Sequence, residues 1–164
     1  MNGTRVLIFA MAVYFSAVLQ QAVSHHLAIA GARPDFPLLM MALLCQYTSR
    51  SGGALLGFFF GLFHGVLPGA NLTHYVLSRT MTGFMVSWSK SLGFEHSLLS
   101  NVVSVVSATV FAQVIWMFGA GPSNILGFFG DTIRTALYNG VLVVPMFALI
   151  TKMMGPPGKS SGSF

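Results

Sequence analysis

Five polar or ionisable residues stand out because the sequence places them in or beside long apolar stretches. They are His74, Arg79, Asp131, Arg134 and Asn139. An ionisable side chain inside a membrane segment is costly, so by default it faces the interior of a helix bundle and has a partner there. Asp131 and Arg134 are three residues apart, which places them on one helical face. We therefore predict a polar cluster within the membrane, either an ion-pair network that locks helices together or a pocket for a ligand or ion.

The other reactive side chains do not form a recognisable catalytic or metal site. His25 and His26 are adjacent and diverge on a helix, and the remaining histidines lie in different segments without a ligand-like spacing. No nucleophile, base and orienting group can be named together. No phosphate-binding loop of the form GxxxxGK[ST] occurs. The sequence therefore predicts a protein that is not an enzyme and that has no metal site and no cofactor.

A glycine recurs at every fourth position of "GGALLGFFFGLFHGVLPG", residues 52–69. Helices in lipid associate through close backbone approach, which small residues allow. A step of four residues turns about 400° around a helix, so the glycine stripe winds by only about 40° per step. The predicted seam, for helix packing or partner binding, consists of Gly57, Gly61, Gly65 and His64. Gly53 and Gly69 are predicted to be loop or cap glycines. The seam either lies inside the bundle or receives a partner helix.

The composition indicates that these residues belong to a membrane protein. The chain of 164 residues is 54% hydrophobic and only 7% charged, whereas a soluble domain has about 25% charged residues. The net charge of +5 comes from basic residues that are scattered singly between apolar runs. A nucleic-acid-binding surface would cluster them on one face. We predict an integral membrane protein that sits in the lipid bilayer and does not bind nucleic acid.

Six apolar segments could form an all-α bundle of six transmembrane helices. The second and third are shorter than the roughly 17–25 residues that a spanning helix needs. They are either tilted and sheltered by neighbouring helices or form a re-entrant hairpin. Residues 1–154 are predicted to form a single transmembrane domain, and residues 155–164 a flexible cytoplasmic tail. The expected spans are Val6–Val23, Phe36–Tyr47, Ala54–Leu67, Leu72–Trp88, Leu98–Phe118 and Ile133–Met153.

The distribution of basic residues predicts the orientation. With six spans and a cytoplasmic N-terminus, the C-terminus is also cytoplasmic. Arg33, beside Asp35, is then the loop cation on the outer side. This bias agrees with the tendency of cytoplasmic loops to carry Lys and Arg. The basic residues expected on the cytoplasmic side are Arg5, Arg50, Lys90, Lys152 and Lys159.

Several motifs occur in an order that extends over nearly the whole chain. They are "RPDFPLL" at 33–39, "GALLGFFFGLFHGVLPGANL" at 53–72, "GF" at 83–84 and "NGVLVVPMFALITK" at 139–152. In these motifs the chain resembles the MreD family of rod shape-determining membrane proteins. The family commonly has an aspartate at the position of Gly65. Here the polar residue is His64, one position earlier, which rotates the side chain by about 100°.

The resemblance implies a bacterial inner-membrane protein that works as a non-enzymatic scaffold of the cell-elongation machinery. The implied partner is an MreC-like protein with a single membrane span. The MreB filament and a glycosyltransferase–transpeptidase pair for peptidoglycan synthesis are implied indirectly. The family is also similar in fold to the six-helix substrate-binding subunits of energy-coupling-factor transporters. Two other functions therefore stay open: a transporter subunit that binds a vitamin-like molecule, and a structural oligomer that associates through the glycine face.

Overall fold

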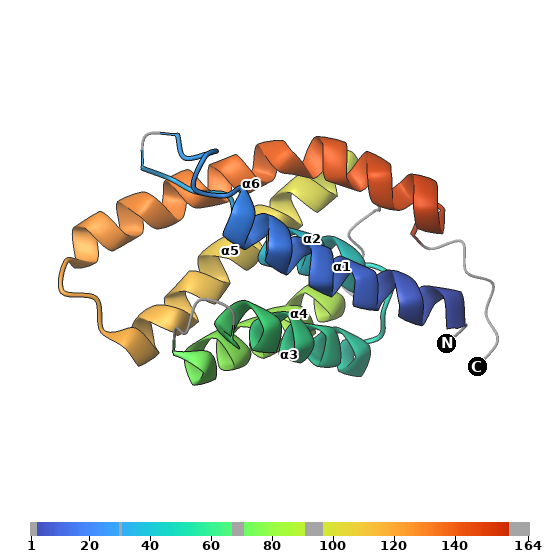
Figure 1. The fold of residues 1–164 in the computed structure, drawn as a ribbon, viewed down its shortest axis with the longest axis horizontal. Coiled ribbons are helices and arrows are strands. Elements are labelled where there is room, and N and C mark those ends of the chain that lie inside the picture. Colours follow the sequence, from blue (N-terminus) through green and yellow to red (C-terminus); the bar gives the residue numbers. More distant parts are fainter. Residues whose placement is uncertain (1–2, 30, 67–70, 91–96, 158–164) are drawn as a thin grey trace.

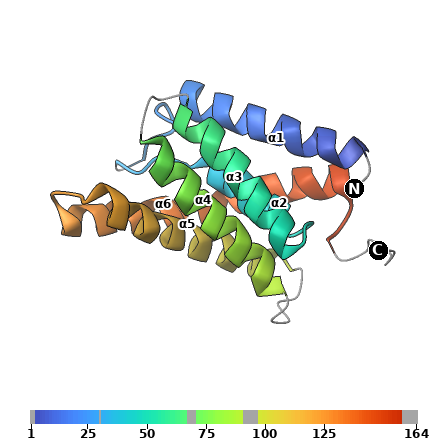
Figure 2. The same ribbon diagram turned by 90° about the horizontal axis from the view of Figure 1, so that it is seen from below.

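Six α-helices follow one another in the described part of the chain, a computed structural model in which residues 3–29, 31–66, 71–90 and 97–157 are placed (Figure 1). The helices are α1 (Gly3–Ala22), α2 (Phe36–Cys45), α3 (Arg50–Val66), α4 (Leu72–Ser89), α5 (Leu98–Ala120) and α6 (Ile125–Met154). Consecutive helices run in alternating directions along the long axis, as Figures 1 and 2 show. The fold is therefore all-helical, as the sequence predicts.

Hydrogen bonds of two side chains, Tyr47 and Lys90, show which helix ends meet. The Tyr47 hydroxyl donates to the carbonyl of Gly155, and the Lys90 ammonium donates to the carbonyls of Gln46 and Thr48. The ends of α2, α4 and α6 therefore lie together, and α1, α3 and α5 begin at the same end of the bundle (Figure 2). We call this the Lys90 end. The opposite end, where α2, α4 and α6 begin, is called the Asp35 end.

The short helix α2 is the centre of the bundle. It contacts each of the other five helices, and every one of its residues except Met40 is buried. Asp35 caps its first turn by accepting a hydrogen bond from the backbone N–H of Leu38 (3.0 Å), and Pro37 fits the start of a helix because its missing N–H has no helical partner there. A helix of ten residues that is enclosed by protein need not satisfy the length requirement of a lipid-facing span.

The start of the last helix differs from the sequence prediction. The predicted span begins at Ile133, whereas α6 begins at Ile125. Gly121 ends α5 in a left-handed conformation (φ 54°), and the side chain of Asn124 caps α6 by accepting from the N–H of Gly127 (3.0 Å). The connection is therefore only a few residues long. The glycines at 127 and 130, which suggested a loop, lie inside the helix.

Within the described residues, three helices are long and apolar enough to cross a membrane: α1, α5 and α6. α3 has 17 residues and α4 has 18, and both carry polar residues. The expected cytoplasmic tail at 155–164, with Lys159, lies outside the described residues from 158 onward. Gly69 and the loop at 91–96 also lie outside the described residues.

Candidate functional site

A buried ion pair joins the start of α2 to α4. An oxygen of the Asp35 carboxylate accepts a short hydrogen bond from the Arg79 guanidinium. Asp35 is 7% exposed and Arg79 is 3% exposed. Removing one partner of such a pair leaves an uncompensated buried charge, which typically costs about 3–5 kcal/mol. The pair therefore fixes α4 against the N-terminus of α2.

Asn139 extends this pair to the two long C-terminal helices. Its side-chain carbonyl accepts from the backbone N–H of Asp35 (3.0 Å), and its amide donates to the hydroxyl of Thr109 on α5 (3.2 Å). Asn139 and Thr109 are both fully buried. Four helices thus meet through one chain of hydrogen bonds, and a buried polar network of this kind favours a single packing arrangement.

His64 adds the end of α3 to the same region. Its Nδ1 lies 3.9 Å from an oxygen of the Asp35 carboxylate. Its ring packs on that of Tyr75 with the centroids 4.5 Å apart, and the Arg79 guanidinium lies 5.9 Å from the centre of the Tyr75 ring. His64 is buried. We call Asp35, His64, Arg79, Thr109 and Asn139 the Asp35 network.

The polar cluster expected from the sequence is therefore divided in the structure. Arg79 and Asn139 lie in the Asp35 network, but Asp131 and Arg134 form an i,i+3 pair (3.5 Å) whose side chains are 65% and 58% exposed. This part of the expectation is wrong because both side chains are largely exposed on α6, although Asp131 also borders the cavity described below. His74 lies apart from them, packed against Gly119 of α5.

Asp35 and Thr109 belong to the network but are not among the site residues predicted from the sequence. The sequence places Asp35 in a loop beside Arg33, although an aspartate just before "FP" is a typical helix cap. No capping pattern or comparable sequence signal marks Thr109. In the structure its hydroxyl also donates to the carbonyl of Val105 in its own helix (2.8 Å). The partner of Arg79 could thus have been found from the capping pattern, but Thr109 could not.

A cavity of about 360 Å³ lies against the Asp35 network. It is lined by the end of α1, the segment before α2 and parts of α3, α4, α5 and α6, and it is partly open. Trp116 and Phe128 stack across it with the ring planes 10° apart. The charged residues in its lining are Arg33, Asp35, Arg79 and Asp131. The cavity is therefore polar and charge-balanced, and it lies at the Asp35 end.

The glycine seam lies between α3 and α4. A methyl group on Gly57 would collide with the carbonyl of Arg79, and one on Gly61 would lie 2.7 Å from the carbonyl of Tyr75. Gly65 faces Leu72 in the same way. Gly53, expected as a loop or cap residue, is also part of this helical contact and faces Gly83. The seam is therefore covered by α4 of the same chain.

Compared with known protein families, residues 2–155 match MreD, described as rod shape-determining protein MreD. The chain belongs to the MreD family. No curated protein and no solved structure matched the chain. In this MreD-family chain, the buried carboxylate of Asp35 approaches α3 at His64, whose Nδ1 lies 3.9 Å away. Among the described residues, no group of three or more His, Cys, Asp or Glu side chains could hold a metal ion.

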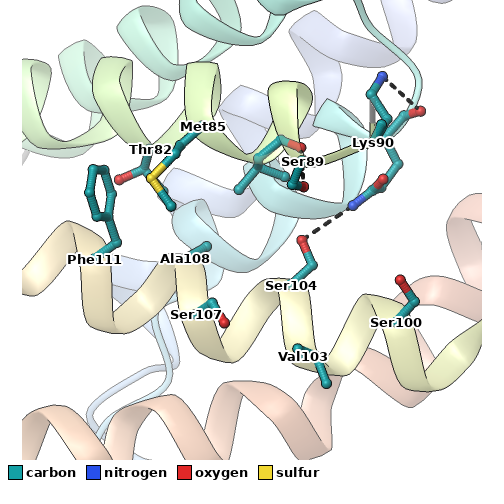
Figure 3. A pocket seen from close by; sticks show the side chains of 12 residues that line it. Thr82, Met85, Ser89, Lys90, Ser100, Val103, Ser104, Ser107, Ala108 and Phe111 are labelled. Atoms are coloured by element: carbon teal, nitrogen blue, oxygen red, sulfur yellow. Dashed lines mark hydrogen bonds between the residues drawn. The ribbon is translucent and has the colours of Figure 1, made fainter. Parts of the chain in front are cut away.

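Two further recesses of the MreD chain lie away from the Asp35 network. One, of about 200 Å³, lies between α4 and α5 near Lys90 (Figure 3). There the Gln46 amide donates to the Ser104 hydroxyl (3.3 Å), and burial lowers the pKa of Lys90 from its ordinary value. The second, of about 490 Å³, is an apolar groove between α1 and α3. Its lining includes Val6, Phe9, Ala10, Val13, Leu55 and Phe59.

Proposed function

We propose that this MreD-family chain is a non-enzymatic membrane scaffold of the machinery that elongates rod-shaped cells. Its direct partner is an MreC-like protein with a single membrane span. Through that partner it acts with the MreB filament and a glycosyltransferase–transpeptidase pair, and it supports peptidoglycan synthesis. The observation that carries the proposal is the family match over residues 2–155, nearly the whole chain.

The groove between α1 and α3 is the docking surface that we propose for the partner helix. The glycine seam, the other candidate surface, is occupied by α4. The groove is lined mainly by aliphatic and aromatic side chains, with small residues at Ala10 and Gly52. Small residues let a second helix approach closely, and the neighbouring large side chains pack around it.

We further propose a multi-pass arrangement in the bacterial inner membrane with both termini in the cytoplasm. Arg5, Arg50, Lys90 and Lys152 belong to the Lys90 end of the bundle. Cytoplasmic segments are enriched in Lys and Arg, so the Lys90 end is the cytoplasmic one. The Asp35 end then faces the periplasm.

The docking surface is tested by filling the groove without adding a polar group. Ala10 is exposed and lines the groove, so Ala10→Leu narrows it. We expect this variant to lose co-purification of a tagged MreC-like partner in detergent while its own unfolding temperature is unchanged. Ala148→Leu is the matched control, because Ala148 is exposed on α6 and does not line the groove.

Retention of the partner by Ala10→Leu would reject the groove as the docking surface. Failure of the unmodified chain to co-purify with the partner would reject the scaffold function itself. The second function expected from the sequence, a transporter subunit for a vitamin-like molecule, rests on a fold likeness that the comparisons do not support. Cross-linking of engineered cysteines on α3 would detect the third, a structural oligomer.

A further inference from the structure

Four polar atoms that border the cavity at the Asp35 end are buried without a hydrogen-bond partner among the described residues. They are Nδ1 of His64, Oγ of Ser78, Nε of Arg79 and Nε1 of Trp116. Ser78 is 1% exposed and Arg79 is 3% exposed. Buried polar atoms in folded proteins are nearly always paired with protein groups or with water, so these four atoms need partners from water or from a bound molecule in the cavity.

The chemistry of these atoms defines one half of that molecule. The Nε–H of arginine and the indole N–H of tryptophan can only donate a hydrogen bond, and the serine hydroxyl can donate as well. The molecule must therefore present acceptor oxygens to Ser78, Arg79 and Trp116. A carboxylate or phosphate group fits this need best, because charge-assisted hydrogen bonds to arginine are the strong ones.

The charges of the lining define the other half. Arg33 and Arg79 balance the charges of Asp35 and Asp131 in the lining, so a ligand that is only anionic would give the cavity a net negative charge. An ammonium group on the same ligand offsets that charge. The rings of Tyr75, Trp116 and Phe128 line the same cavity, and aromatic faces attract cations.

We propose that this cavity binds a zwitterion that carries one oxyanion and one ammonium group. The oxyanion lies toward Arg79, Ser78 and Trp116, and the ammonium lies toward Asp131 and the aromatic rings. The volume of about 360 Å³ falls in the range of small-molecule sites, about 300–1,000 Å³. Two sources offer this chemistry: a soluble zwitterion such as an amino acid, and the headgroup of phosphatidylethanolamine in the surrounding bilayer. The proposal does not rest on the scaffold function.

The test measures the unfolding temperature of the full-length chain, purified in a maltoside detergent and stripped of lipid. The probes are alanine, glycerophosphoethanolamine, phosphatidylethanolamine, phosphatidylglycerol with the same acyl chains, and inorganic phosphate. We expect at least one of the three zwitterions to raise the unfolding temperature in a saturable way, and phosphatidylglycerol and phosphate to do so less. A shift with phosphatidylethanolamine alone assigns the membrane as the source, and a shift with alanine or glycerophosphoethanolamine assigns a headgroup-sized soluble ligand.

Two variants separate binding from structure. Ser78→Ala and Trp116→Phe each remove one polar atom that has no partner within the described residues, and Trp116→Phe keeps an aromatic ring against Phe128. The unfolding temperature without ligand should therefore not fall. Affinity for the zwitterion should fall about tenfold in each variant, the loss expected for one hydrogen bond to a buried group. Trp88→Phe, at the other end of α4, is the matched control and should bind as the unmodified chain does.

Three results would overturn the proposal. The first is no saturable shift with any of the zwitterions. The second is an equal or larger shift with phosphatidylglycerol or phosphate, which would assign a simple anion site. The third is unchanged affinity in both Ser78→Ala and Trp116→Phe. None of these results depends on whether an MreC-like partner co-purifies, so the scaffold proposal is tested separately.

Discussion

At the scale of single residues, Asp35 connects the start of α2 to both α4 and α6. Its carboxylate caps α2 and pairs with Arg79, and its backbone N–H binds Asn139. The sequence predicted that Arg79 and Asn139 face the bundle interior, because polar groups in apolar helices do so. It did not predict their common partner, since 44 residues separate Asp35 from Arg79 and no local pattern links them.

The two arginines of the expected cluster should respond very differently to truncation. Arg79→Ala leaves the buried Asp35 carboxylate without its partner, so we expect a loss of about 3–5 kcal/mol of stability. Arg134→Ala removes one member of an exposed pair with Asp131, for which the loss should stay below about 1 kcal/mol. Thermal or denaturant unfolding in detergent measures both.

A double variant shows whether the buried charge itself causes the effect. Asp35→Leu combined with Arg79→Leu removes both charges, and replacing a buried ion pair by apolar side chains is often neutral. The double variant should therefore be more stable than Arg79→Ala. If it is less stable, the loss comes from packing or from the cap of α2 rather than from an unpaired charge.

At the scale of elements, the α3–α4 contact shows what a glycine pattern can and cannot predict. The fourfold spacing predicts a close-approach face on α3, and in the structure Gly53, Gly57 and Gly61 lie against the backbone of α4. The identity of the opposing helix depends on which surface has matching small residues, and Gly83 on α4 supplies the match for Gly53. The pattern could not show whether Gly53 belongs to the seam. A glycine that packs near a helix end cannot be told by sequence from a glycine that caps the helix.

Substitution in the seam should destabilise the chain even when only one methyl group is added. Gly57→Ala places that methyl against the backbone carbonyl of Arg79, which cannot rotate away as a side chain can. We expect a loss of about 1–3 kcal/mol, the usual cost of overpacking. Gly130→Ala on α6 meets no atom within 4 Å and should be neutral or stabilising by up to about 1 kcal/mol. Equal unfolding temperatures for the two variants would contradict a tight α3–α4 seam.

At the scale of the whole molecule, the alternating helices separate two kinds of charge. The Lys90 end carries basic residues that lie at helix termini, whereas the Asp35 end carries a balanced set around a cavity. The sequence predicted that most basic residues gather on one side, from the order of apolar segments and the positive-inside tendency, but it did not predict the balanced set around the cavity. It did not predict that the second segment is a central helix. The composition of a short apolar segment does not show whether lipid or protein surrounds it.

Cysteine labelling can decide which end faces the cytoplasm. Cys45 is fully buried, so the unmodified chain should not react with a membrane-impermeant maleimide. Ser49→Cys lies between α2 and α3 at the Lys90 end, and Ser123→Cys lies between α5 and α6 at the Asp35 end; both positions are exposed. We expect Ser123→Cys to react in intact spheroplasts and Ser49→Cys to react only after lysis. The opposite pattern would invert the proposed topology.

The position of α2 also has a consequence for biogenesis. Asp35 is synthesised long before its partners: the chain must lengthen by 44 residues before Arg79 exists and by 104 residues before Asn139 exists. During that interval the nascent chain holds a carboxylate at the start of a ten-residue apolar helix whose enclosing helices have not all been made. When α2 is inserted in its turn along the sequence, it cannot yet take its final position among the other helices. The helix α2 can become the centre of the bundle only when α6 has been made. The synthesis of the last helix therefore completes the packing of a helix near the start of the chain.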